Sequence, residues 1–328
     1  MEHLACAAHA NLVYQRSITQ MTAKNDAFQL RRATFTDLDA VYALIAQQNS
    51  SDFGSALLSR EELRQRWQDA DFSLATQTQA AFSADGQLMG YAEIRPYHAK
   101  QFLLQLYLSP AAATHEIGQR LIAALEANLP TGTQLMNQTG GTNMPNQEVL
   151  TAAGFAQGLT FLMMEIELNE PPPKPVWPEG IVVRPFQPNQ DEQATYLTDE
   201  AASRDKGYAN PLSFEKWAKR MGLHAEQFDP SLWFLACHDE KVVGVALNMY
   251  LPEQNYGVID HLGVLRQWRG QGMGLALLRH SFATFFARGI TKLKLNVDSG
   301  SLTNAPRLYE KAGMKTVHSY HIFSKTIS

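Results

Sequence analysis

The sequence predicts an α/β protein in which one fold occurs twice in tandem. Apolar runs typical of buried strands alternate along the chain with amphipathic stretches typical of helices. Short landmarks recur in the same order in both halves, at an offset that drifts only from 152 to 159 residues. A proline-rich stretch, Glu170–Pro178, lies between the halves, and its prolines exclude a helix or strand there. The chain therefore has two copies of one unit.

Four pairs of landmarks define the repeat. They are Arg32 with Arg184, Gly90 with Gly244, Leu106–Leu108 with Leu262–Val264, and Ala153–Phe155 with Ala312–Met314. We expect an N-terminal extension over residues 1–28, a first domain over 29–169, a linker over 170–178 and a second domain over 179–328.

Local patterns predict the elements of each copy. Residues 30–46 predict a strand, a polar turn with Asp37 at the helix N-cap, and an amphipathic helix. Residues 83–90 and 238–244 each predict a hairpin turn that enters a strand. Later, a strand ending at Val264 precedes a helix over 275–287, a strand over 291–298, a short helix capped by Asn304 and ended by Gly313, and a last strand over 316–325.

Composition restricts the function. The 328 residues are 45% hydrophobic and 18% charged, as in globular proteins with a sizeable core, and the net charge of −4 argues against nucleic acid. Cys6 and Cys237 are far apart and lack zinc-site spacing, so neither a disulfide framework nor a metal is expected. No apolar run approaches the ~20 residues of a membrane span. We expect a cytoplasmic monomer or homodimer without nucleic-acid or membrane partners.

A glycine-rich loop follows the strand that ends at Val264. Residues 269–274 read Arg-Gly-Gln-Gly-Met-Gly, so the backbone can turn sharply and present N–H groups at a helix N-terminus. Such an end carries partial positive charge and suits a phosphate or pyrophosphate. A dinucleotide fingerprint would need glycine where Leu275 stands, and the Gly-Lys-Ser/Thr of a P-loop is absent. The loop therefore predicts another nucleotide-like ligand.

Arg269–Gly274 resembles the R/Q-x-x-G-x-G/A signature of the GNAT superfamily, the GCN5-related N-acetyltransferases. Residues 305–314 resemble the family's A-x-x-L-Y-E-x-x-G-F/M helix, and the elements around both motifs follow the family's order. The tandem arrangement is similar to that of mycothiol synthase. The resemblance implies two tandem GNAT folds, each a mixed, mostly antiparallel sheet flanked by helices, and acetyl-coenzyme A as co-substrate.

The resemblance also implies catalytic residues in the second copy. Because side chains alternate along a strand, Asp260 is expected to share a face with Leu262 and Val264 beside the coenzyme cleft, which makes it the candidate base. His261 would face the other way and is the alternative, and a water chain is a third route. Tyr309 aligns with the family's general acid. If these residues are not catalytic, an ion pair with an arginine or a hydrogen bond at the strand end would explain Asp260, and packing in the core would explain Tyr309.

Backbone groups of Leu262, Gly263 and Val264 are expected, by the resemblance, to hold the pantetheine arm and the acetyl carbonyl. The pyrophosphate is expected at Arg269, Gly270, Gln271, Gly272, Met273, Gly274 and Leu275. Ser301 and Asn304 lie near the place where the family often has an asparagine that contacts the coenzyme, although Asn304 is better explained as a helix cap.

The first copy is expected to be degenerate. Its counterpart of the glycine loop is Ala113–Gly118, where Glu116 replaces a glycine and adds a carboxylate that would repel a pyrophosphate. Leu104 and Leu150 stand where the second copy has Asp260 and Tyr309. We therefore expect a structural role for this copy, with a vestigial site for some other ligand as the alternative.

The predicted function is transfer of acetyl from acetyl-coenzyme A to the primary amine of a small molecule, by direct attack of the amine on the thioester. An alkylamine is mostly protonated at neutral pH, so a base is needed. The acceptor is expected to contact residues 199–229, where Asp205, Tyr208 and Glu215 would suit a cationic or polar amine. A solvated helical face of mixed charge is the competing explanation of these three residues, and the stronger one. A non-catalytic acyl-coenzyme A sensor or interaction module is the alternative function, and an enzyme that acetylates proteins is a weaker one.

Overall fold

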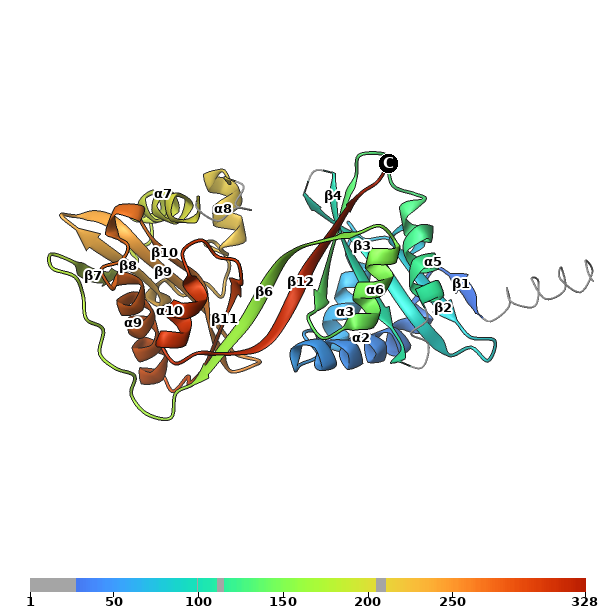
Figure 1. Cartoon of the computed structure of the whole chain (residues 1–328), viewed down its shortest axis with the longest axis horizontal. Coiled ribbons are helices and arrows are strands. Elements are labelled where there is room, and N and C mark those ends of the chain that lie inside the picture. The colour runs from blue at the N-terminus through green and yellow to red at the C-terminus, as the bar shows by residue number, and fades with distance from the viewer. Residues whose placement is uncertain (1–27, 99, 111–114, 205–210) are drawn as a thin grey trace, which may run out of the picture. The chain divides into compact units, whose positions relative to one another are not determined.

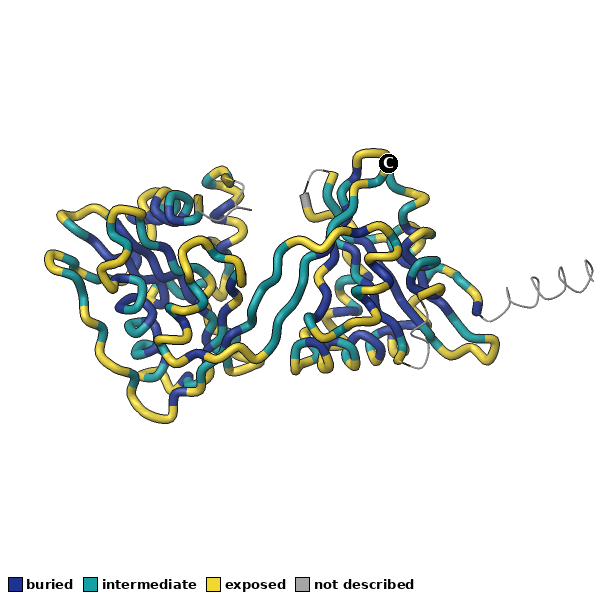
Figure 2. Tube along the Cα trace, in the orientation of Figure 1, coloured by how far each residue is buried: buried dark blue, intermediate teal, exposed yellow. Residues whose placement is uncertain are grey.

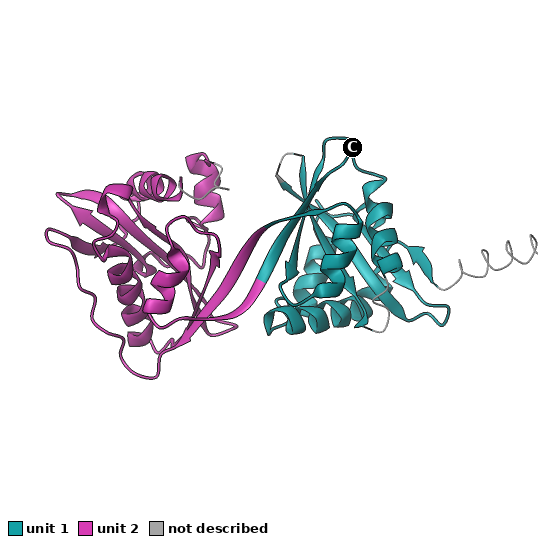
Figure 3. Cartoon of the chain, in the orientation of Figure 1, with its two compact units in different colours: residues 1–158, 320–328 teal, residues 159–319 magenta. Residues whose placement is uncertain are grey.

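The computed structural model describes residues 28–98, 100–110, 115–204 and 211–328 (Figure 1). The chain divides into two compact units. Within the described residues, unit 1 comprises the chain up to Gly158 together with Tyr320–Ser328, and unit 2 comprises Leu159–Ser319 (Figure 3). Each unit is an α/β structure built on a mixed, mostly antiparallel sheet.

In unit 1 the strand order is β1-β2-β3-β4-β5-β12, and β4 and β5 pair in parallel. The strands are β1 (Gln29–Arg31), β2 (Thr78–Phe82), β3 (Leu88–His98), β4 (Gln101–Leu108), β5 (Gln134–Gly140) and β12 (Lys315–Thr326). The helices are η1 (Phe35–Asp37), α2 (Leu38–Phe53), α3 (Arg60–Gln68), α4 (Leu74–Gln77), α5 (His115–Glu126) and α6 (Met144–Ala152).

In unit 2 the order is β6-β11-β10-β9-β8-β7, and β10 and β11 pair in parallel. The strands are β6 (Ala156–Glu167), β7 (Val182–Pro185), β8 (Trp233–His238), β9 (Lys241–Leu251), β10 (Tyr256–Val264) and β11 (Lys292–Asp298). The helices are α7 (Glu192–Ser203), α8 (Phe214–Arg220), η3 (Pro230–Leu232), η4 (Arg266–Trp268), α9 (Met273–Ala287) and α10 (Ala305–Lys311).

Each sheet is buried on both faces by helices (Figure 2). In unit 1, α2 and α3 cover one face around Tyr91 and Tyr107, and α5 and α6 cover the other. In unit 2, α8 packs one face around Trp217, and α9 and α10 pack the opposite face. Strand residues alternate between these clusters, as expected where both faces of a sheet are covered.

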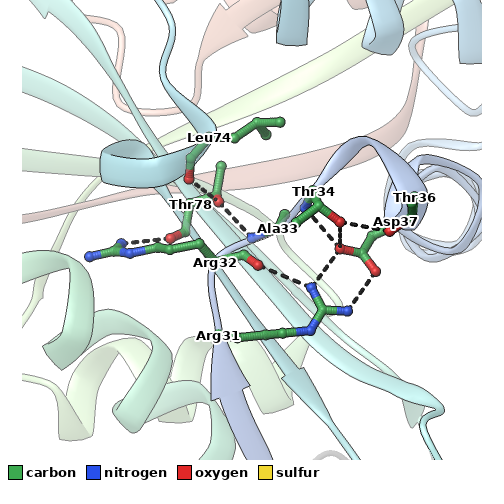
Figure 4. Close-up of polar contacts among 8 residues, drawn as sticks. All are labelled: Arg31, Arg32, Ala33, Thr34, Thr36, Asp37, Leu74 and Thr78. Atoms are coloured by element: carbon green, nitrogen blue, oxygen red, sulfur yellow. Dashed lines mark hydrogen bonds and ion pairs between the residues drawn. The ribbon is translucent and has the colours of Figure 1, made fainter.

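A duplicated ion pair confirms the internal repeat. In unit 1 the Arg31 guanidinium donates to both carboxylate oxygens of Asp37 at 2.7 Å, and Asp37 also accepts from the Thr34 backbone N–H (Figure 4). The Arg31 guanidinium holds the pKa of Asp37 at about 2. In unit 2 Arg184 lies at the same place and bonds Asp191.

The landmark pair of Arg32 with Arg184 was therefore wrong by one position. Arg32 donates instead to the backbone oxygen of Thr78 at 2.6 Å, on the far side of the strand from the ion pair (Figure 4). Adjacent residues on a strand point to opposite faces, so Arg31 is the counterpart of Arg184. Asp37 does occupy the N-cap position of α2. Its carboxylate accepts hydrogen bonds from Arg31 and makes no capping hydrogen bond to α2.

Two strands are exchanged between the halves of the sequence. Residues 161–167 of β6 pair with β11 and thus complete the sheet of unit 2. Residues 320–326 of β12 pair with β5 and complete the sheet of unit 1. The domain boundaries expected from the sequence follow chain order and do not contain this exchange, because pairing between distant strands leaves no local sequence signal.

In each unit the parallel strands part at their carboxyl ends. The pairing of β4 with β5 covers residues up to Leu104, and that of β10 with β11 covers only Gly257 and Val258. The remainder of β10, up to Val264, stays paired with β9 on its other edge. The opening between β10 and β11 is the setting of the candidate site.

Candidate functional site

The glycine loop adopts a backbone that requires glycine. Gly270 and Gly272 have φ of 75° and 85°, in the left-handed region, and Gly272 is the N-cap of α9. A Cβ at either position would meet nothing within 4 Å, so the loop is open on its outer side. At Gly274 a Cβ would lie 3.2 Å from Leu308 of α10. The first turn of this 15-residue helix thus presents backbone N–H groups at an open surface, as predicted.

Arg269 braces the loop from inside. Its Nε donates to the backbone oxygen of Val264 at 2.9 Å, and one Nη donates to that of Ala202 at 3.1 Å. The side chain therefore ties the end of β10 to the last turn of α7. The guanidinium of Arg269 therefore helps to fix the shape of the loop.

A cavity of about 620 Å³ lies where β10 and β11 part, beside the helix N-terminus. Most of the predicted site residues line it: Asp260, Leu262, Gly263, Val264, Arg269, Gly270, Gly272, Met273, Gly274, Leu275, Ser301 and Tyr309. Gln271 and Asn304 are not in its lining. Asn304 has φ of 58° at the N-cap position of α10 and makes no side-chain cap bond, so its predicted position is confirmed and its capping bond is not.

Asp260 sits on a β-bulge. On the partner strand β9, Asn248 faces Ile259 and Leu247 faces His261, so Asp260 is the extra residue. The strict alternation expected for β10 is therefore wrong: Ile259 and Leu262, three positions apart, pack in the same apolar cluster. Asp260 still reaches the cavity wall, because the bulge turns it outwards. Its side chain is exposed and forms no hydrogen bond or ion pair with any other described residue, which removes the arginine partner as an explanation.

His261 is held from the other face of the strand. Its Nδ1 lies 2.9 Å from a carboxylate oxygen of Asp199 on α7, and Trp217 Nε1 donates to the same carboxylate at 2.9 Å. Asp199 is buried, with a side chain only 4% exposed. The histidine thus faces away from Leu262, as expected, in a fixed orientation.

Tyr309 lies on α10 and is 8% exposed. It packs in the apolar cluster of α9 and α10 and also lines the cavity. The core packing of Tyr309 is thus observed, and its contact with a ligand stays a prediction. Ser301 lines the cavity from the loop before α10, where its hydroxyl lies 3.0 Å from that of Thr303.

Several lining residues were missed from the sequence. Ala202 of α7, Asn296 of β11 and Ala305 of α10 all line the cavity, and Asp199 orients His261. Small apolar residues carry no chemical signal of their own. Of the acceptor candidates, Asp205 and Tyr208 lie outside the described residues, and Glu215 is exposed at the start of α8.

The described counterparts of Asp260 and Tyr309 in unit 1 are apolar. Leu104 and Leu150, the counterparts of Asp260 and Tyr309, are fully buried. Glu116 lies in the first turn of α5, 3.8 Å from Arg120. Residues 111–114, which include part of the counterpart of the glycine loop, lie outside the described residues.

Within the part of the chain that the structure describes, three or more histidine, cysteine, aspartate or glutamate side chains do not gather in a metal-binding arrangement. The same residues contain no helix of the length and apolarity needed to cross a bilayer.

Comparison with known proteins agrees with this geometry. Residues 194–314 match the acetyltransferase (GNAT) family model. A mycothiol acetyltransferase from Streptomyces griseus is 28% identical over 298 residues, which cover 88% of this chain and 92% of that protein. A GCN5-related N-acetyltransferase from Sphaerobacter thermophilus, known from its crystal structure, is 31% identical in sequence and matches with a TM-score of 0.75. The match covers 92% of this chain and 96% of that protein's chain.

A tandem GNAT protein from the clavulanic acid biosynthesis pathway shares the fold, with 12% identity, a TM-score of 0.66 and coverage of 92% of this chain and 99% of its own. The open glycine loop, the parted strands and these relatives lead to one conclusion: the chain belongs to the GNAT superfamily of acetyltransferases and is a tandem member of it.

Proposed function

We propose that the chain transfers the acetyl group of acetyl-coenzyme A to the primary amine of a small molecule, and that unit 2 performs the reaction. The observation that carries this proposal is the convergence, in one cavity, of a glycine loop at a helix N-terminus, the free edge of β10, Asp260 and Tyr309. The relatives named mycothiol acetyltransferase support an acceptor of small size.

The residues present fit acetyl-coenzyme A as a substrate. At Gly270 and Gly272 the backbone is left-handed and open, so N–H groups of residues 269–275 can approach a pyrophosphate without a side chain in between. The edge of β10 from Leu262 to Val264 faces the cavity and offers backbone hydrogen bonds to the amides of a pantetheine arm. Acetyl-coenzyme A supplies the acetyl group as an activated thioester.

Asp260 is the proposed base. A primary alkylamine has a pKa near 10, so it reaches the site mostly as the ammonium ion and must lose a proton before it can attack. The Asp260 carboxylate stands at the cavity wall without a protein partner among the described residues, and it can accept that proton directly or through one water. The buried Asp199 fixes the ring of His261, which is the second candidate for the same role.

Tyr309 is the proposed acid. Its ring is fixed by packing against α9, and its position in the cavity wall allows its hydroxyl to donate a proton to the departing thiolate. A thiolate is already a good leaving group, so this donation speeds the reaction moderately.

Thiol release provides the test. The purified chain is incubated with acetyl-coenzyme A and a panel of small amines, and free coenzyme A thiol is measured. Acetylated product from at least one small amine is expected. Binding of the coenzyme without thiol release from any amine would instead favour an acyl-coenzyme A sensor. Release only with lysine-rich peptides would favour an enzyme that acetylates proteins.

A further inference from the structure

In unit 1 the opening between the parted strands is filled by the chain's own amide groups. Gln48 of α2 reaches the free edge of β4: its Nε2 donates to the backbone oxygen of Leu106 at 3.0 Å, and its Oε1 accepts from the backbone N–H of Leu108 at 3.0 Å. Asn146 of α6 donates to the same Leu106 oxygen at 2.9 Å. These contacts satisfy backbone groups that a neighbouring strand would otherwise satisfy.

The repeat identifies the counterparts of these residues in unit 2. The buried aspartates Asp37 and Asp191 lie 154 positions apart, and the same offset pairs Gln48 with Ala202. The Ala-Gly landmarks at the end of α6 and α10 lie 159 positions apart, and that offset pairs Asn146 with Ala305. Both amide side chains of unit 1 are thus replaced by alanine in unit 2.

Contacts within each unit support this alignment. Gln48 bonds Leu106 and Leu108, whose counterparts are Leu262 and Val264. In unit 2, a Cβ placed on Gly263 would lie 3.0 Å from the Cβ of Ala202. The helix position therefore faces the same stretch of strand in both units.

The size of the remaining cavity differs accordingly. In unit 1 the cavity bounded by Gln48, Leu108 and Asn146 measures about 280 Å³. In unit 2 the cavity bounded by Ala202, Val264 and Ala305 measures about 620 Å³. Ala202 is buried and lines this cavity, so we expect a longer side chain at position 202 to enter it.

We propose that one helix position on each side of the opening determines whether a unit admits the amide-bearing arm of coenzyme A. In unit 2 these positions are Ala202 and Ala305, which leave the edge of β10 open. In unit 1 they are Gln48 and Asn146, which plug the corresponding edge of β4. A glutamine amide carries the same donor and acceptor as the amides of the pantetheine arm, so the plug and the ligand compete for the same backbone groups. The inference rests on the proposed function, in which this edge of β10 holds that arm.

The test introduces the side chains of Gln48 and Asn146, which we call the plug, at the equivalent positions of unit 2. Binding of coenzyme A is measured by isothermal titration calorimetry for the wild-type chain, Ala202→Gln, Ala305→Asn and the double variant. Ala194→Gln adds the same side chain to an exposed position of α7 and is the matched control. Ala202→Gln is expected to weaken binding about 30-fold, because two hydrogen bonds of about 1 kcal/mol each are lost to the side chain. The double variant is expected to bind more weakly still, and the control to bind within about threefold of wild type.

Hydrogen–deuterium exchange of β10 gives a second readout that needs no ligand. In Ala202→Gln the backbone N–H of Val264 should exchange more slowly than in wild type, because the new side chain accepts from it. In the reverse variant, Gln48→Ala, the N–H of Leu108 should exchange faster while coenzyme affinity stays unchanged. If Ala202→Gln does not fold, this reverse arm still tests whether Gln48 closes the edge of β4, and Ala305→Asn still tests coenzyme binding in unit 2.

The outcomes separate the two proposals. Wild-type affinity and unchanged exchange in a folded Ala202→Gln variant would overturn the plug and leave the proposed function standing. Coenzyme binding by wild type without acetyl transfer would reject the proposed function while the plug stands. Failure of wild type to bind coenzyme A would overturn both.

Discussion

Replacing Asp260 with asparagine tests the proposed chemistry most directly. The side chain is exposed on a bulge and makes no hydrogen bond or ion pair with other described residues, so Asp260→Asn should change the free energy of unfolding by less than about 0.5 kcal/mol. Its effect on activity should be large, because a positioned base contributes roughly 10²- to 10⁴-fold. We expect kcat/KM for the best amine substrate to fall at least about 100-fold at pH 7, with coenzyme affinity unchanged.

The pH dependence gives the sign of the effect. Without a base, only amine that is already neutral can attack, which is roughly one molecule in a thousand at pH 7 for a pKa near 10. The neutral fraction rises about tenfold per pH unit, so the deficit of Asp260→Asn should narrow steadily between pH 7 and pH 9. Initial rates of thiol release across this range measure it.

His261→Gln supplies the matched comparison on the same strand. It removes the imidazole ring and leaves Asp260 in place, and a fall in kcat/KM of less than about tenfold is expected. A large, pH-dependent loss in His261→Gln together with near-normal activity in Asp260→Asn would refute the assignment and identify the histidine, held by Asp199, as the base.

Three further changes have defined outcomes. Tyr309→Phe should lower kcat about tenfold with unchanged coenzyme affinity in calorimetry, and an unchanged kcat would reduce Tyr309 to a packing residue. Gly272→Ala forces a left-handed backbone onto alanine and should weaken coenzyme binding. The control is Gly289→Ala, which has a similar φ of 76° and equally open surroundings; both variants should lose ~1 kcal/mol of stability in urea unfolding, but Gly289→Ala should not affect binding. Equal effects of the two variants on binding would contradict the loop assignment. Asp37→Asn should cost about 1–2 kcal/mol at pH 7, allowing for the half-exposed Arg31. Because the folded pKa of Asp37 is lowered from 3.8 to about 2, this stabilisation should be complete above about pH 4 and disappear as the pH falls through 2; a difference between wild type and variant that persisted below pH 2 in urea titrations would contradict it.

Features set by local backbone preference were predictable from the sequence. The turn at residues 269–274 needs glycines at left-handed positions, and the hairpin between β8 and β9 places Asp239 and Glu240 at φ of 45° and 64°, as its polar turn sequence suggested. The helix that carries Tyr309 follows from its proline and glycine boundaries. In each case the residues that determine the structure are neighbours in the chain.

Features that depend on distant partners were not predictable in the same way. The bulge at Asp260 shifts register by one residue, and a strand sequence does not record which partner residue it faces. The contact between Asp199 and His261 joins residues 62 positions apart. The proposed role of Ala202 follows only from comparison with its counterpart Gln48, because an alanine has no polar group that would indicate a function.

The exchange of β6 and β12 has a consequence for biosynthesis. Unit 1 receives its last strand from residues 320–326, so the chain must be synthesised at least as far as residue 326 before the sheet of unit 1 can be completed. Until then the open edge of β5 is exposed to solvent and to other nascent chains, where it can recruit a stray strand. Cleavage at the proline-rich linker would separate each unit from the strand that the other half of the sequence supplies. The two halves of the sequence are therefore not expected to fold as independent proteins.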